Sequence, residues 1–224
     1  MKKVISYSLW GSNPKYTVGA IKNAESALNI YPDWICRFYV DHTVPKDILF
    51  NLEENPNVEI IVKQAIGDWS SMFWRFEAAY DKDIDITIFR DTDSRLALRE
   101  KFAVDEWIKS NKIFHIMRDH PYHNYPILGG MWGIKNKNSY NIENLLKNFY
   151  DNESSNRYGT DYEFFIKILY PIIKEDCVVH DEFFDKNPFP KKREGFEFVG
   201  EPFNYDDTPC DPKHREEIKK YEIF

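Results

Sequence analysis

Cysteine is scarce in this chain of 224 residues, which contains only three, and no two of them form a Cys-x-x-Cys pair. Cys36, Cys177 and Cys210 lie far apart, which argues against a disulfide framework or a zinc site and suits a reducing compartment. No stretch approaches the roughly 20 apolar residues that span a bilayer, and the apolar run after Met1 is too short for a signal peptide. We therefore expect a soluble, cytoplasmic protein without a transmembrane segment.

Several motifs of nucleotide-binding and hydrolytic enzymes are also missing. The chain has no Gly-x-Gly-x-x-Gly and no phosphate-loop sequence. The motifs that would indicate a dinucleotide-dependent oxidoreductase or a nucleoside triphosphatase are therefore missing. The chain has no Gly-x-Ser-x-Gly nucleophile elbow either. The formal net charge of −7 argues against a protein that binds nucleic acid by neutralising its phosphates. We therefore expect no nucleic-acid partner.

The chain does contain enough apolar material for a large core. Its residues are 42% hydrophobic and 17% aromatic, and its length predicts a single domain over residues 1–224. Strand-like runs alternate with segments of helical periodicity, which predicts an α/β fold with a mostly parallel central sheet and helices on both faces. The expected strands are 4–9, 34–40, 58–62, 84–91, 113–117 and 131–134. The expected helices are 15–29, 45–54, 70–80, 99–110, 141–150 and 160–171, and the chain after residue 180 is expected to be irregular.

The most informative segment is an apolar, β-branched run over residues 84–89, followed closely by Asp91 and Asp93. Ile and Thr stiffen the backbone toward β geometry, so this run predicts a buried strand. At the carboxyl end of such a strand the chain leaves the sheet, where open α/β sheets bind ligands. Two carboxylates there repel one another unless a cation lies between them, and Mg²⁺ or Mn²⁺ holding a diphosphate would satisfy both. A turn or helix cap is the alternative, because Asp, Thr and Ser are common there too.

Together with the sequence Gly129-Gly130-Met131-Trp132-Gly133, this strand and its Asp-x-Asp resemble GT-A-fold glycosyltransferases, over about residues 4–203. The resemblance implies a Rossmann-like domain with a nucleotide-binding half (1–93), an acceptor half (94–203) and a C-terminal tail (204–224). It also implies a nucleotide-diphosphate sugar as donor, a glycan or other hydroxyl acceptor, and a Mn²⁺ or Mg²⁺ ion that grips the diphosphate. Arg90 and Arg95, on either side of the motif, are unusual in the family and suggest a separate bacterial or viral branch.

The resemblance assigns roles to individual residues. Asp91 and Asp93 match the metal-binding pair, and Asp91 often reaches the donor as well. His180 matches a late histidine that completes the metal shell in many members. Arg75, on the helix before the motif strand, matches an arginine whose charge steadies Asp91 or the donor sugar.

Further residues match the acceptor side and the leaving-group side of the family's site. Gly130, with Gly129 before it, matches a glycine pair that lets sugar approach the backbone, because glycine has no side chain. Asp161 matches the acidic residue at the donor–acceptor junction, although a charge complementing a helix start is the alternative. Lys191 and Arg193 lie where a basic segment folds over the diphosphate, and a solvated charge run is the alternative. The residue after Asp161 is not the Gln found in several branches.

A loop of polar and aromatic residues, 118–125, lies between two expected strands. Aromatic rings with polar tips suit sugars because they offer apolar faces and hydrogen-bond donors together. The pair His120 and His123 lacks the nearby Cys or His partners that would complete a zinc site. An acceptor-binding loop, a structural loop and a separate metal site remain as alternatives.

These residues predict a metal-dependent glycosyltransferase. If the sugar carbon is inverted, Asp161 would take the proton of the acceptor hydroxyl; if its configuration is retained, Asp161 would orient the donor or stabilise the cation-like sugar. One alternative is a haloacid-dehalogenase-like phosphatase, in which Asp91 would be the nucleophile and Asp93 the acid. Its motif belongs at the first strand, however, whereas three strand–helix units precede Asp91 here. The other alternative is a non-catalytic module that binds nucleotide sugars.

Overall fold

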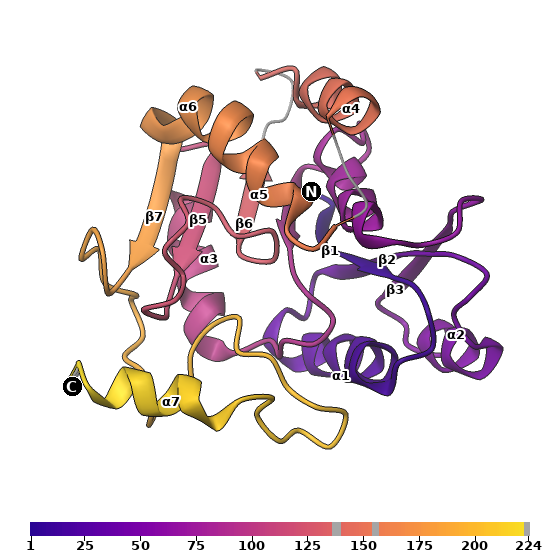
Figure 1. Ribbon diagram of the computed structural model, residues 1–224, viewed down its shortest axis with the longest axis horizontal. Coiled ribbons are helices and arrows are strands. Elements are labelled where there is room, and N and C mark those ends of the chain that lie inside the picture. Colours follow the sequence, from indigo (N-terminus) through magenta and orange to yellow (C-terminus); the bar gives the residue numbers. More distant parts are fainter. Residues whose placement is uncertain (136–139, 154–156, 222–224) are drawn as a thin grey trace.

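The computed structural model describes residues 1–135, 140–153 and 157–221. These residues form a seven-stranded sheet in the order β3-β2-β1-β4-β6-β5-β7 (Figure 1). Neighbouring strands are parallel, except that β6 runs antiparallel to both β4 and β5. The predicted α/β fold with a mostly parallel sheet is confirmed. The strands are β1 Lys3–Leu9, β2 Ile35–Val40, β3 Val58–Val62, β4 Ile86–Phe89, β5 Phe114–Arg118, β6 Trp132–Lys135 and β7 Cys177–Asp181.

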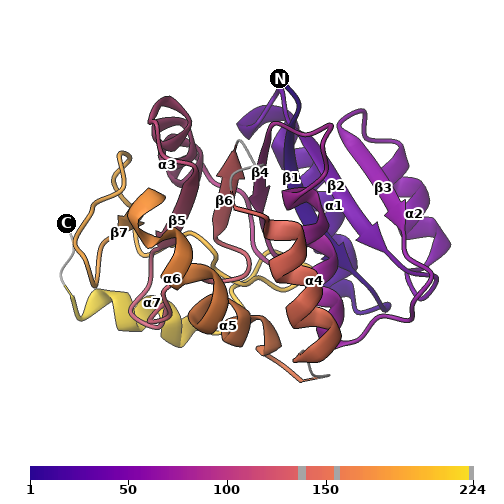
Figure 2. The same ribbon diagram turned by 90° about the horizontal axis from the view of Figure 1, so that it is seen from above.

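Helices cover both faces of the sheet. They are α1 Pro14–Ile30, α2 Lys46–Glu53, the 3₁₀ helix η1 Trp69–Ala79, α3 Leu98–Lys109, α4 Ile142–Asn152, α5 Thr160–Phe164, α6 Tyr170–Ile173 and α7 Pro212–Lys219. One apolar core joins Ile5 and Leu9 of β1 to α1, α2 and α3. A second core, on the other face, joins Val4 and Phe89 to η1, α4 and α5. The helices α4 and α5 lie across the sheet from α1 and α2 (Figure 1 and Figure 2). Among the described residues, no helix combines the length and apolar character needed to cross a bilayer.

The segment predicted as a helix over residues 70–80 is a 3₁₀ helix rather than an α-helix. Three hydroxyl groups on the adjacent strands account for this, because they donate to backbone carbonyls spaced three residues apart. The donors are Ser8, Ser6 and Thr87, and the accepting carbonyls are those of Met72, Arg75 and Ala78, at 3.3, 2.7 and 3.1 Å. Only a helix with three residues per turn places such carbonyls in one row. The strands thereby fix both the type of this helix and the position of Arg75.

The helix that begins at Thr160 does not end at Pro171, as the sequence predicts. It continues through a π-helical turn, η3 (Phe165–Leu169), into α6 and then a 3₁₀ turn, η4 (Lys174–Asp176). Because α6 starts directly after the π turn, Pro171 lies in a first turn, where the missing N–H of proline costs little. The π turn thus lets the helix pass the proline.

The chain after residue 180 is also more ordered than expected. It contains α7, and the segment before α7 lies against the turn that follows β4. The N–H of Phe203 donates to the carbonyl of Asp93 at 2.7 Å, and Pro202 forms a β-bridge with Ser94. The C-terminal segment from Phe198 onward, called the tail from here on, therefore packs on the Asp-x-Asp turn.

One face of α1 packs on the same turn from the other side. Asn23 donates from its side chain to the carbonyls of Thr92 and Ser94 at 3.1 and 2.8 Å. Gly19, four residues earlier, lies so close that an added Cβ would be 2.2 Å from the Thr92 carbonyl oxygen. Residues four apart share a helix face, so α1 holds this turn along its length.

Replacing Gly19 with Ala tests this packing. The new methyl group would overlap a backbone atom that Asn23 also holds, so we expect the free energy of unfolding to fall by about 1–3 kcal/mol. Urea unfolding gives this value. Glu25→Ala, at an exposed position of the same helix, should change it by less than about 0.5 kcal/mol. Equal stability of the two variants would contradict the close packing of α1 on Thr92.

Candidate functional site

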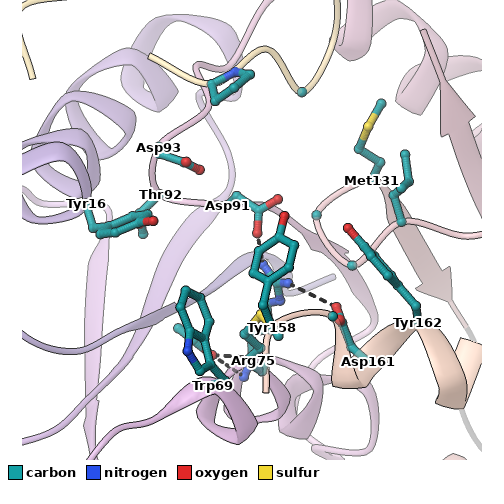
Figure 3. A pocket seen from close by; sticks show the side chains of 18 of the residues that line it. Tyr16, Trp69, Arg75, Asp91, Thr92, Asp93, Met131, Tyr158, Asp161 and Tyr162 are labelled. Atoms are coloured by element: carbon teal, nitrogen blue, oxygen red, sulfur yellow. Dashed lines mark hydrogen bonds and ion pairs between the residues drawn. The ribbon is translucent and has the colours of Figure 1, made fainter. Parts of the chain in front are cut away.

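A pocket of about 660 Å³ opens where the carboxyl ends of β1 and β4 meet the tail (Figure 3). Its walls come from the β1–α1 loop (10–13), the turn after β4 (91–93), the loop before β6 (128–131), the start of α5 and the tail. Such a position, at the carboxyl ends of parallel strands, is where open α/β sheets bind ligands. Of the predicted site residues, it is lined by Arg75, Asp91, Asp93, Gly129, Gly130 and Asp161.

Arg75 is the buried centre of this site. Its side chain is 4% exposed, and Nη1 binds Oδ1 of Asp91 and the carbonyl of Arg90, the latter at 3.0 Å. Nη2 lies 3.8 Å from Oδ2 of Asp161, so the guanidinium stands between two carboxylates (Figure 3). Its backbone N–H donates to the Ser8 hydroxyl at 3.0 Å. A buried arginine with charged partners on two sides holds those partners in fixed positions.

Gly129 and Gly130 give the two carboxylates their room. A Cβ on Gly129 would lie 2.3 Å from Oδ2 of Asp161, and one on Gly130 would lie 2.1 Å from Oδ2 of Asp91. The sequence predicts that this glycine pair lets a sugar approach the backbone. In the structure, the carboxylates of Asp91 and Asp161 occupy the space that a side chain at either glycine position would fill.

Asp93 faces a cation that the sequence analysis did not identify. Its Oδ2 lies 2.7 Å from Nζ of Lys15, and its side chain is 16% exposed. Burial raises the pKa of Asp93, the negative charge of Asp91 raises it further, and Lys15 lowers it. The two carboxylates of the Asp-x-Asp motif therefore repel one another while each is bound to a protein cation.

Asp161 is the most perturbed acid of the pocket. Burial raises its pKa to about 6, with Arg75 acting to lower it and Asp91 to raise it. A carboxyl group with such a pKa is largely ionised at neutral pH and accepts a proton more readily than an exposed aspartate. That is the property of a general base.

His180 is not brought to the carboxylate pair, which corrects the prediction that it completes a metal shell. It lies on β7, three strands from β4 in the sheet, or roughly 14 Å at the usual strand spacing. Its Nδ1 is 2.8 Å from Nε2 of His115, and its Nε2 is 3.5 Å from Glu106. His180 is buried and does not line the pocket, so it does not share a cation with the Asp-x-Asp turn.

Lys191 and Arg193 do not line the pocket either, contrary to the prediction that they cover a diphosphate. Lys191 pairs with Glu194, a neighbour on its own segment. The side chain of Arg193 is buried, and its Nη2 lies 2.7 Å from Oδ1 of Asp119. Asp119 also binds Arg99 at 2.9 Å and has no exposed surface, so this charge cluster fastens the segment to the body of the protein.

Asp91 and Asp93 remain the residues that fit a divalent ion. Mg²⁺ and Mn²⁺ accept carboxylate oxygens and are commonly held by one or two carboxylates together with substrate phosphates. Their mutual repulsion also favours a cation. Within the described residues, no cluster of three His, Cys, Asp or Glu side chains offers a complete protein cage. The donor set therefore fits an ion that arrives with a phosphate ligand.

The other end of the pocket is aromatic and contains three histidines that the motif analysis did not bring together. The backbone N–H of Asp119 donates to Nδ1 of His123 at 3.1 Å, and that of Tyr122 donates to Nδ1 of His120 at 3.0 Å. Both rings are thus acceptors at Nδ1 and carry their proton at Nε2. Burial lowers the pKa of both, that of His123 to about 3. His214 of α7, with its ring centre 5.3 Å from that of His120, completes the cluster.

No protein-family model and no curated protein sequence matches this chain. Solved structures do match. A glycosyltransferase involved in the glycosylation of the major capsid of PBCV-1 is similar with a TM-score of 0.53 at 15% identity, over 81% of this chain and 83% of that chain. The galactosyltransferase LgtC, in complex with donor and acceptor sugar analogues, has a TM-score of 0.51 at 12% identity, over 99% and 96%. The chain has a GT-A fold.

An enzyme of another class also has a similar fold. A 4-diphosphocytidyl-2C-methyl-D-erythritol synthase from Anaerococcus prevotii has a TM-score of 0.53 at 13% identity, over 86% of this chain and 91% of that chain. At such identities a likeness shows the fold alone. The function must therefore be argued from the residues of the site.

The pKa of Asp161 predicts a pH dependence of stability. The folded pKa of about 6 exceeds the ordinary value of 3.8, so the folded protein binds this proton more tightly than the unfolded chain. The resulting stabilisation is present at low pH and is lost as pH rises from about 4 to 6, by about 3 kcal/mol. We predict that Asp161→Asn removes this loss, as measured by urea unfolding across that range. Parallel pH curves for the wild type and the variant would contradict the raised pKa.

Proposed function

We propose that this protein is a metal-dependent glycosyltransferase that moves a sugar from a nucleotide-diphosphate donor to a hydroxyl group. The observation that supports it best is the convergence of Asp91 and Asp161 on buried Arg75, beside Asp93, in one pocket. This arrangement offers a place for a cation with a diphosphate next to a separate acid–base group. Metal-assisted transfer with inversion would use both functions, one at the diphosphate and one at the acceptor hydroxyl.

The donor would occupy the part of the pocket lined by the β1–α1 loop, the Asp-x-Asp turn and Arg75. A divalent ion held by Asp91 and Asp93 would supply Lewis-acid stabilisation of the departing diphosphate. Arg75 would orient Asp91 through a charge-assisted hydrogen bond. The pair of glycines keeps the loop before β6 from displacing these carboxylates.

Asp161 would act at the sugar carbon. In an inverting reaction it removes the proton of the acceptor hydroxyl, which a carboxylate with a pKa of about 6 can do near neutral pH. In a retaining reaction its charge would stabilise the cation-like sugar instead. Its position 3.8 Å from Arg75 fixes the carboxylate relative to Asp91 in either case.

The acceptor would occupy the histidine-rich end of the pocket. His120 and His123 are held neutral, each accepting a backbone N–H at Nδ1. The Nε2–H of His120 donates to the carbonyl of His214 at 2.9 Å, so of these two rings His123 is the one proposed to donate to the acceptor. Phe198 packs 4.5 Å from His120, ring centre to ring centre, and adds an apolar face. Uncharged rings with polar edges suit a neutral sugar better than a phosphate. Of the alternatives for residues 118–125, this arrangement favours the acceptor-binding loop.

No observation favours the phosphatase alternative. Asp91 follows β4, the fourth strand along the chain, whereas the phosphatase motif belongs at the first strand. A non-catalytic module would keep nucleotide binding but would show no turnover. An enzyme that transfers nucleotides would release pyrophosphate from a nucleoside triphosphate.

Ligand binding gives the first test of the proposed function. The melting temperature should be measured with UDP, GDP, CMP and dTDP, each with and without Mn²⁺. We expect one of these nucleotides to stabilise the protein, and EDTA to abolish that effect, because binding to the folded state raises the melting temperature. The corresponding nucleotide sugars then test turnover through release of the nucleotide. No stabilisation by any of them would contradict the proposal.

Asp91→Asn tests the carboxylate pair. Loss of one negative ligand should reduce release of the nucleotide from the donor sugar by about a hundredfold or more. Because buried Arg75 also loses a charged partner, the melting temperature without ligand should fall as well, and turnover is compared at a temperature at which the variant is folded. The matched control is Asp105→Asn, which changes an exposed aspartate paired with Lys101 on α3. Equal turnover of the two variants would contradict a role for Asp91.

Tyr122→Ala tests the acceptor end. The ring lies beside His214, with centres 5.7 Å apart, and lines the pocket. Its loss should raise the KM for a sugar acceptor by up to about tenfold and leave acceptor-independent hydrolysis of the donor unchanged. Tyr205→Ala is the control, because Tyr205 is equally exposed in the tail but does not line the pocket. A change in donor hydrolysis alone would place Tyr122 on the donor side.

A further inference from the structure

The first turn of α1 places Lys15 next to Asp93. Lys15 is the second residue of α1, where its backbone N–H donates to the capping side chain of Asn13 at 3.0 Å. Gly19 and Asn23 continue the same helix face and fix it against the turn after β4. The backbone of Lys15 and the backbone of Asp93 are both held in place by these contacts. The distance of 2.7 Å between the ammonium group and the carboxylate therefore follows from the fold.

The position of Lys15 is unfavourable for a lysine when the helix alone is considered. The first turn of α1 contains no acidic residue, and the positive end of the helix dipole repels a cation there. The side chain also passes beside the ring of Tyr16, 5.1 Å from its centre, toward a pocket whose wall Asp93 forms. Contact with Asp93 is the interaction in this structure that offsets the cost.

Two protein cations face the Asp-x-Asp motif, and one of them, Arg75, also lies beside Asp161. Asp91 is bound by Arg75 and Asp93 by Lys15, so each carboxylate of the Asp-x-Asp motif already has a protein cation. The side chain of Arg75 is 4% exposed, whereas that of Lys15 is 28% exposed. Arg75 is confined by its buried hydrogen bonds, and Lys15 is the partner that can leave.

We propose that Lys15 is a placeholder cation, which competes with a divalent ion for Asp93 and makes binding of that ion depend on the nucleotide diphosphate. The dependence on the nucleotide rests on the proposed function. Competition at Asp93 does not.

The physical reason is charge balance in a partly buried site. A divalent ion that arrives alone must displace one ammonium group and then lie close to both Lys15 and Arg75, which repel it. A nucleotide diphosphate brings negative charge, which balances the positive charges of the divalent ion and of the displaced Lys15 ammonium group. Ion and nucleotide therefore strengthen one another's binding, and the coupling is equal in both directions.

Binding of Mn²⁺ alone tests the competition without any measure of activity. Electron paramagnetic resonance of free Mn²⁺ gives its dissociation constant for the wild type, Lys15→Met and Lys22→Met. Lys22 is the matched control because it lies on α1 and pairs with an exposed carboxylate, that of Asp207. We expect Lys15→Met to bind Mn²⁺ at least about tenfold more tightly than the other two.

Two further variants separate loss of charge from loss of structure. Lys15→Gln should also bind Mn²⁺ more tightly, whereas Lys15→Arg should bind it as weakly as the wild type. Melting temperatures without ligand establish that each variant is folded. The same Mn²⁺ affinity in the wild type and Lys15→Met, or no binding by either, would overturn the proposal.

The nucleotide measurement is separate. Mn²⁺ titrations are repeated with saturating UDP, or with whichever nucleotide stabilises the protein. We expect the nucleotide to tighten Mn²⁺ binding strongly in the wild type and much less in Lys15→Met. An equal effect in both would overturn the coupling. Failure of every nucleotide to bind would contradict the proposed function, while the comparison with Mn²⁺ alone would still decide whether Lys15 competes for Asp93.

Discussion

The geometry of the pocket depends on one buried guanidinium group. Arg75 is held from behind by hydroxyl groups of β1 and in front binds Asp91 and approaches Asp161. A buried arginine that lost one of these partners would leave an uncompensated charge, so its position is strongly determined. Through Arg75, the sheet fixes the positions of two carboxylates, Asp91 and Asp161, that lie in different halves of the chain.

The regular part of the fold follows from local patterns in the sequence. Apolar β-branched runs predict β1, β2, β3, β5 and β6 to within one residue at each end, and they place β4 inside a longer expected run, 84–91. The type of η1 depends on hydroxyl groups that come from other strands, which no local pattern contains. The π turn before Pro171 follows from helix continuation against a packed core. The helix α7 has only Ile218 buried, so it shows almost no periodicity.

The acidic half of the site can be predicted and its cationic half cannot. Asp91 and Asp93 stand directly after a strand, so their location follows from the strand itself. Which cation a carboxylate binds depends on tertiary contacts: Arg193 meets its partner Asp119 across 74 residues of sequence. The one local signal for Lys15 is its place in the first turn of a helix, where the helix dipole makes a positive charge unfavourable.

The tail that packs on the Asp-x-Asp turn also sets the order in which the pocket can be completed during synthesis. Asp93 leaves the ribosome about a hundred residues before Pro202 and His214, which is roughly 5–20 seconds at usual rates of translation. During that interval the first half of the sheet can form, but the wall made by Phe198, Gly200 and α7 does not yet exist. The pocket therefore gains its full set of walls only after the tail has been synthesised, long after the Asp-x-Asp turn.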